Sequence, residues 1–132
     1  MIVLDASVLV EVLLGRPSIE RFAHRLRDPN EALHVPHLID LEIAQTLRRY
    51  QAIGEMSPQH ARQALLAFVQ MPLERHPHWP FLDRIWELRR NLTAYDAAYV
   101  ALAEALDALL LTCDRALASA PGHRAVVELI EG

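Results

Sequence analysis

The sequence predicts an α/β domain with a central, mostly parallel β-sheet, and three observations support this prediction. Short aliphatic runs alternate with longer stretches in which apolar residues recur at helical spacing. Residues 109–112 form one continuous apolar run, which is typical of a strand covered on both faces. The 132 residues, 52% of them hydrophobic, are enough for the core of one domain, so we expect a single domain over residues 1–132.

Local signals mark where the elements begin and end. Gly15 suits the left-handed conformation that often ends a helix, and Asp28-Pro29-Asn30 is a turn sequence. Ser57 followed by Pro58 is typical of an N-cap and the first residue of a helix. In chain order, we expect a strand at 1–5, helices at 7–14 and 17–27, a strand at 33–35, helices at 38–53 and 58–70, a strand at 72–75, helices at 81–90 and 93–106, and strands at 109–112 and 125–130.

The charged residues exclude several kinds of chemistry. The formal net charge is −4, from 17 acidic and 13 basic side chains, and every basic residue is an arginine. Without lysine, the chain has neither a Schiff-base nucleophile nor a P-loop lysine. Its single cysteine, Cys113, excludes a disulfide framework and a thiolate metal cage. The negative charge also argues against strong nonspecific adhesion to nucleic acid.

The apolar segment at the start of the chain does not have the pattern of a signal peptide. No basic residue precedes Arg16, and Asp5 and Glu11 interrupt the apolar run. No stretch approaches the ~20 apolar residues that a membrane-spanning helix needs. We therefore expect a cytoplasmic protein that does not associate with a membrane.

Two acidic residues, Asp5 and Asp114, lie just past predicted strands. Ligands of open parallel sheets bind in the crevice outside the ends of the strands, which makes both acids candidate ligands. The alternative is that each acid begins a turn or caps the next helix.

Two more acids, Glu42 and Asp96, occupy unusual positions on predicted helices. Glu42 falls within the apolar stripe of its helix, where a carboxylate needs a cation, a hydrogen-bond donor or a proton. Its structural alternative is an ion pair with Arg49. Asp96 follows Thr93 by three residues, which is the spacing of a capping box, although a capping carboxylate can still present an oxygen to a cation.

Taken together, these four acids predict a metal site. Carboxylates from two strand ends and two helices can converge on one crevice, where they would repel one another unless a cation bound them. Ligand sets made only of oxygen favour hard divalent ions, so we expect Mg²⁺ or Mn²⁺ rather than zinc.

Four blocks of sequence lead to a family resemblance. They are residues 1–7 (Met-Ile-Val-Leu-Asp-Ala-Ser), residues 40–48, residues 92–104 and residues 110–117. The third block, Leu-Thr-Ala-Tyr-Asp-Ala-Ala-Tyr-Val-Ala-Leu-Ala-Glu, is the most specific. In these blocks, which span nearly the whole chain, the sequence resembles the PIN-domain ribonucleases, and among them the VapC toxins of bacterial toxin–antitoxin modules.

The resemblance implies a three-layer α/β/α fold, RNA cleavage that depends on Mg²⁺ or Mn²⁺, a cognate VapB-like antitoxin that blocks the active groove, and a homodimer. The acidic quartet of the family falls on Asp5, Glu42, Asp96 and Asp114. Ser7 and Thr112 match small hydroxyl positions that usually support the site. Some relatives carry a further acid after the fourth, where this chain has Arg115, Ala116 and Leu117, so the number of metal ions, one or two, stays open.

Within this quartet, we expect Asp5 and Asp96 to be the principal ligands, Asp114 a direct or water-mediated ligand, and Glu42 a ligand or the base that orients water. Arg115, next to Asp114, is the candidate for substrate contact. Two other functions compete with this one. A phosphoacceptor receiver domain normally needs a lysine near its acids, and this chain has none. A catalytically weak PIN module would only bind RNA or antitoxin, and the intact acidic set argues against it.

The histidines offer a competing metal hypothesis. His34 and His37 flank Pro36, and His76 and His78 flank Pro77, but neither pair has the i, i+4 spacing of ligands on a helix. We therefore expect exposed or loop histidines with no role in a site.

Overall fold

The computed structural model describes residues 1–131 and has five parallel strands at its centre. The strands are β1 (Ile2–Leu4), β2 (Leu33–Pro36), β3 (Leu73–His76), β4 (Leu109–Thr112) and β5 (Val127–Leu129). Their order in the sheet is β3-β2-β1-β4-β5, and every neighbouring pair is parallel. The predicted strands are thus confirmed, in a sheet that is entirely parallel over the described residues.

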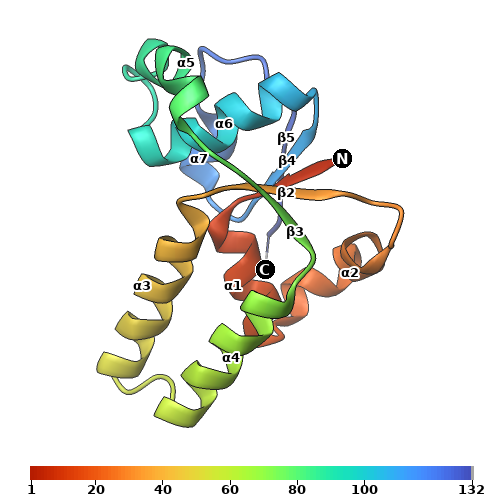
Figure 1. Cartoon of the computed structure of the whole chain (residues 1–132), viewed down its shortest axis with the longest axis vertical. Helices are drawn as coiled ribbons and strands as arrows, with labels where there is room; N and C mark the ends of the chain where they lie inside the picture. Colours follow the sequence, from red (N-terminus) through yellow and green to blue (C-terminus); the bar gives the residue numbers. More distant parts are fainter. Residues whose placement is uncertain (132) are drawn as a thin grey trace.

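Helices cover both faces of this sheet (Figure 1). They are α1 (Ala6–Leu14), α2 (Glu20–Arg27), α3 (Ile39–Ala52), α4 (Pro58–Gln70), α5 (Leu82–Glu87), α6 (Ala94–Leu106) and α7 (Arg115–Ser119), with 3₁₀ helices η1 (Pro17–Ile19) and η2 (Trp79–Phe81). Helix α6 packs against β1, β2 and β4 on one face of the sheet and contacts α5. On the other face, α1 packs together with α3 and α4. This arrangement confirms the three-layer α/β/α fold.

The core lies between the sheet and its two central helices. All three residues of β1 are fully buried, as the aliphatic run predicted. Residues 97–103 of α6 are buried on every side, so this alanine- and leucine-rich helix lies inside the protein. None of the helices within residues 1–131 has the length and apolarity to cross a bilayer.

Three details differ from the sequence predictions. The helix expected from Pro17 begins as η1 and becomes α-helical only at Glu20. The helix expected at 81–90 ends at Glu87, where the amide of Leu88 reaches the carbonyls of both Arg84 and Ile85 and tightens the last turn. Helix α7 was not predicted, because five residues are too few to show a helical period.

The expectation of exposed or loop histidines was wrong for two of them. His34 is buried in the middle of β2, and His76 is the last residue of β3. The expectation failed because a search along the chain for i, i+4 spacing cannot detect residues that meet across neighbouring parallel strands.

The strand order also fixes where a ligand can bind. From β1 the sheet grows through β2 to β3 on one side, and through β4 to β5 on the other. Open α/β sheets bind their ligands at such a reversal, outside the carboxyl ends of the two strands. In this protein the reversal lies between β1 and β4, the strands that precede Asp5 and Asp114.

Candidate active site

The four acids predicted from the sequence line a single cavity of about 320 Å³. Asp5 and Asp114 follow β1 and β4, while Glu42 and Asp96 lie in the first turns of α3 and α6. The amino-terminal ends of these two helices place backbone dipoles beside the carboxylates, which favours negative charge there. The structure thus brings together side chains that are up to 109 positions apart in the sequence, from Asp5 to Asp114.

Asp5 is held by hydroxyl groups on two elements. The Ser7 hydroxyl and the Thr112 hydroxyl each donate a hydrogen bond of 2.7 Å to the same oxygen, Oδ2. In turn, Ser7 Oγ accepts the amide of Cys113 at 2.9 Å, and Thr112 Oγ1 accepts the amide of Asp114 at 3.0 Å. These bonds tie the start of α1 to the end of β4 and fix Asp5, leaving the other carboxylate oxygen unused by either hydroxyl.

The cavity disfavours charge on three of its carboxyl groups. Burial is the main cause that raises the pKa of Asp5, Glu42 and Asp96 above their ordinary values. Negative charge on neighbouring acids raises these pKa values further: Asp114 acts on Asp5, and Asp5 acts on both Glu42 and Asp96. The hydroxyl donors on Asp5 act in the opposite direction, but burial outweighs them. The site is therefore a cluster of mutually repelling acids that a cation would stabilise.

Glu42 takes its hydrogen bond from Tyr99 rather than forming an ion pair with Arg49. Tyr99 is fully buried on α6, and its hydroxyl donates to Oε1 of Glu42. This bond lowers the pKa of Glu42, against the larger effect of burial. Arg49 is exposed and lines the same cavity with Tyr50.

Asp96 and Asp114 take part in capping helices, as their structural alternatives predicted, and they also line the cavity. The amide of Asp96 donates to Thr93 Oγ1 at 3.2 Å, so Thr93 is the N-cap of α6. Oδ1 of Asp114 accepts the amides of Ala116 at 2.9 Å and Leu117 at 3.4 Å, which caps α7. Both carboxylates nevertheless line the cavity.

A hard divalent cation fits this donor set. Glu11 lines the cavity together with the four predicted acids, which makes five carboxylates, and the cationic side chain that lines it is Arg49. Oxygen donors of this kind suit Mg²⁺ and Mn²⁺. The raised carboxyl pKa values show that charge here lacks compensation, which a divalent ion would supply.

The structure places Arg115 away from the lining of this cavity. Its guanidinium forms a 2.6 Å ion pair with Glu131, and both side chains are exposed. An exposed arginine of this kind still has several free donors, so its contact with substrate stays a prediction.

Sequence reasoning assigned no role to Tyr99. A signal was nevertheless present, because Tyr99 lies three residues after Asp96 and therefore shares its face of the helix. A tyrosine among alanines on a buried helix needs a partner for its hydroxyl, and the structure supplies Glu42. Tyr99 is thus a residue that positions Glu42.

For the RNA cleavage that the family resemblance implies, we expect the Tyr99→Phe variant to be roughly 10–100-fold slower, because Glu42 loses the donor that orients it. The pKa of Glu42 should rise further without this bond, so the acid limb of the pH–rate profile should move to higher pH. Steady-state cleavage rates between pH 5 and 9 measure both effects. Tyr50→Phe, which removes a hydroxyl from the same cavity, is the matched control, and equal rates and profiles for the two variants would contradict the prediction.

The fold and the carboxylate cavity together define a class of protein. The model of the PIN domain family matches residues 2–123, which is most of the chain. The chain belongs to the PIN-domain family.

Curated relatives identify the group within that family. Ribonuclease VapC12 of Mycobacterium tuberculosis is 40% identical over 130 residues, which cover 98% of this chain and 99% of that protein. VapC ribonuclease Mb0985 of Mycobacterium bovis is 43% identical over 114 residues and 86% of both proteins. By these similarities the chain belongs with the VapC ribonucleases.

Solved structures share the fold at lower sequence identity. A chain of the complex VapBC2 from Rickettsia felis, bound to a promoter DNA fragment, superposes with a TM-score of 0.73 at 17% identity and covers 98% of both chains. PAE2754 from Pyrobaculum aerophilum gives a TM-score of 0.71 at 24% identity, over 96% of this chain and 81% of that one.

Proposed function

We propose that this protein is an endoribonuclease that depends on Mg²⁺ or Mn²⁺ and acts as the toxin of a VapBC-type toxin–antitoxin pair. The observation that carries the proposal is the convergence of Asp5, Glu42, Asp96 and Asp114 on one cavity at the β1–β4 reversal. The similarity to named VapC ribonucleases supports RNA as the substrate.

The carboxylates would hold the cation, each from a differently supported position. Asp5 is the most constrained, because two hydroxyl donors fix its orientation. Asp96 and Asp114 stand at the starts of α6 and α7, and Glu42 is oriented by Tyr99. When bound, a divalent ion supplies positive charge that makes water more acidic and stabilises the charge that develops on the phosphoryl group.

Side chains of the protein would accept the proton of the attacking water and contact the phosphates of the RNA. Glu42 is half-buried, and its raised pKa makes it a stronger base than an ordinary glutamate, so it can accept a proton from water while Tyr99 holds one of its oxygens. Arg49 lines the cavity and can contact a phosphate of the RNA through its guanidinium. We keep Arg115 as a second, peripheral candidate for such a contact.

Cleavage of RNA by the purified protein tests this function. We expect cuts in total RNA with Mg²⁺ or Mn²⁺ and none with excess EDTA, followed at nucleotide resolution. RNA that is bound but not cut in either metal would instead favour the alternative of a catalytically weak PIN module.

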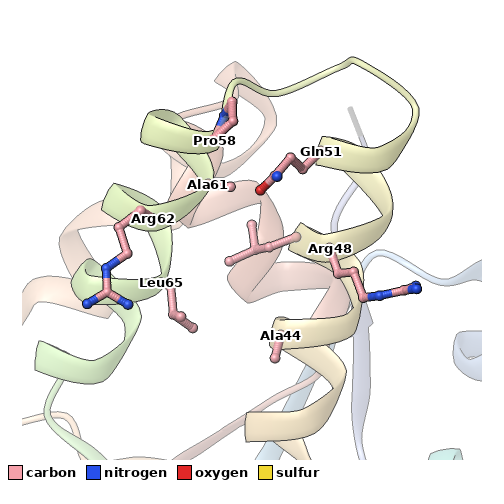
Figure 2. Close-up of a pocket in the computed structure, with 8 residues that line it drawn as sticks. Ala44, Arg48, Gln51, Pro58, Ala61, Arg62 and Leu65 are labelled. Carbon is pink, nitrogen blue, oxygen red and sulfur yellow. The ribbon is translucent and has the colours of Figure 1, made fainter.

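A groove between α3 and α4 is the proposed docking site of a VapB-like antitoxin. It has a volume of about 280 Å³ and lies between helices that form one hairpin (Figure 2). Leu47, Ala61 and Leu65 are among its apolar lining residues. Arg48 and Arg62 extend to opposite sides of it (Figure 2). Such a groove suits an apolar peptide segment flanked by acidic side chains. Because α3 also lines the acidic cavity, a partner seated here would lie beside the active site.

Charge reversal in this groove should weaken the antitoxin complex. We expect Arg48→Glu combined with Arg62→Glu to raise the Kd for the VapB-like protein at least 10-fold, by calorimetric titration, because like charges then face each other. Arg90→Glu, at an exposed position outside the groove, is the control. Unchanged affinity in the double variant would place the antitoxin elsewhere.

We further propose that the protein is one domain, works in the cytoplasm and forms a homodimer. The η2–α5 segment exposes Trp79, Leu82 and Trp86 at spacings of three and four residues. A second copy of the chain packed on this stripe would remove large apolar side chains from water.

A further inference from the structure

Three potential metal ligands meet on the edge of the sheet, in a different place from the acidic cavity. His34 lies on β2, and Glu74 and His76 lie on the edge strand β3. In the parallel register His34 is opposite Glu74, and His76 is two residues further along β3. Residues two apart on a strand point to the same face, so all three side chains share one side of the sheet.

The ligand atoms are close enough to share one ion. Nδ1 of His34 is 2.8 Å from Nε2 of His76 and 3.4 Å from Oε2 of Glu74. All three atoms lie within 4.8 Å of one another. Ligands of a tetrahedral zinc ion, with bonds of about 2.0–2.2 Å, are separated by roughly 3.3 Å. The observed gaps lie on either side of that value, and the half-exposed His76 can move to widen the shorter one.

Within the described part of the chain, hydrogen bonding satisfies only one of the two ring nitrogens of the buried His34. The side chain is 5% exposed, yet its Nε2 has no hydrogen-bond partner among residues 1–131. Its other nitrogen faces a second imidazole, and two such nitrogens can share only one proton between them. Nδ1, the nitrogen that faces both His76 and Glu74, is therefore the atom that a cation could bind in place of the shared proton.

We propose that His34, Glu74 and His76 form a binding site for Zn²⁺, with Nδ1 of His34, Nε2 of His76 and Oε2 of Glu74 as ligands and water as the fourth. Two imidazoles and one carboxylate select zinc over the hard ions suited to an oxygen-only site. A metal binds a neutral imidazole through a ring lone pair, and Nδ1 of His34 faces the other two ligand atoms. The side chain of Glu74 is 65% exposed, which leaves a path for the ion to enter from solvent.

This site is separate from the candidate active site. None of its three residues lines the acidic cavity. Its residues sit within or at the end of β2 and β3, whereas the cavity lies beyond β1 and β4. A zinc ion here would tie the edge strand β3 to β2 and so stabilise the fold without taking part in RNA cleavage. The inference therefore does not depend on the proposed function.

Zinc titration of the full chain, stripped of metal with EDTA and then freed of EDTA, tests the proposal. The Asp96→Asn chain serves as the background, because it weakens binding at the carboxylate cavity. We expect one equivalent of Zn²⁺ to bind with a Kd in the micromolar range or tighter, by calorimetry, and to raise Tm. The visible spectrum of Co²⁺ as a probe should show the intense bands of four-coordinate cobalt.

Variants in the same background locate the site. His76→Gln and Glu74→Gln change accessible side chains, and each should weaken Zn²⁺ binding at least 10-fold and abolish the four-coordinate Co²⁺ spectrum. His60→Gln, which removes an exposed histidine on α4, should leave both unchanged. The proposal would be overturned if the background chain bound no Zn²⁺. It would also be overturned if the His76→Gln and Glu74→Gln variants bound Zn²⁺ as tightly as the background chain does.

Discussion

The Asp96→Asn variant is expected to lose RNA cleavage by at least roughly 100-fold, because several kcal/mol of charge stabilisation depends on an intact ligand set. The substitution keeps the size of the side chain and removes its charge. The amide of residue 96 still donates to Thr93, so the N-cap of α6 is retained. Single-turnover cleavage in saturating Mn²⁺ measures the loss, and far-ultraviolet circular dichroism checks that helicity is preserved.

The stability of this variant without metal separates a functional role from a structural one. Because the pKa of Asp96 is raised in the folded state, its stabilising contribution is complete below the unfolded pKa and is lost as pH rises through the folded value. At neutral pH the charged side chain therefore costs stability, and asparagine should raise Tm in EDTA by roughly 2–5 °C. This gain should shrink as pH falls. A lower Tm together with lost activity would show that Asp96 serves mainly as a structural residue.

Manganese is expected to stabilise the native protein strongly. A ligand that binds only the folded state adds about 2.7 kcal/mol at a concentration of 100 times its Kd, which corresponds to a rise in Tm of roughly 10 °C in a protein of this size. Here the physical source is relief of repulsion among Asp5, Glu42, Asp96 and Asp114. Thermal unfolding in a series of Mn²⁺ concentrations measures the shift.

Two variants assign this stabilisation to the acidic cavity. Asp5→Asn should remove most of the shift, because Asp5 is the most buried of the four acids and carries two fixed hydroxyl donors. His76→Gln should retain the shift, since it alters only the proposed zinc site. A shift that survives in Asp5→Asn would place the manganese elsewhere and count against the metal-dependent nuclease.

Local sequence determined most of the secondary structure, since the signals lie within a few residues of each other. The caps of α4 and α6 are the predicted Ser57 and Thr93, and Gly15 ends α1 with a positive φ of 64°. The apolar run at 109–112 became a central strand because it is compatible with burial on both faces.

The acids could be selected from the sequence because each violated a local rule. Asp5 and Asp114 follow buried strands, Glu42 interrupts an apolar stripe, and Asp96 opens a buried helix. A parallel sheet necessarily gathers the carboxyl ends of its strands at one edge, so the topology brought Asp5 and Asp114 near each other.

Only the tertiary structure decided which side chains touch. The bond from Tyr99 to Glu42 joins α6 to α3, and the contact of His34 with His76 depends on the register of β2 against β3, 42 positions apart. Strand order and register result from long-range packing of the whole core, which no window of sequence contains. For that reason the residues that could bind a hard cation were predictable one by one, whereas the hydroxyl network around Asp5 and the histidine pair required the folded chain.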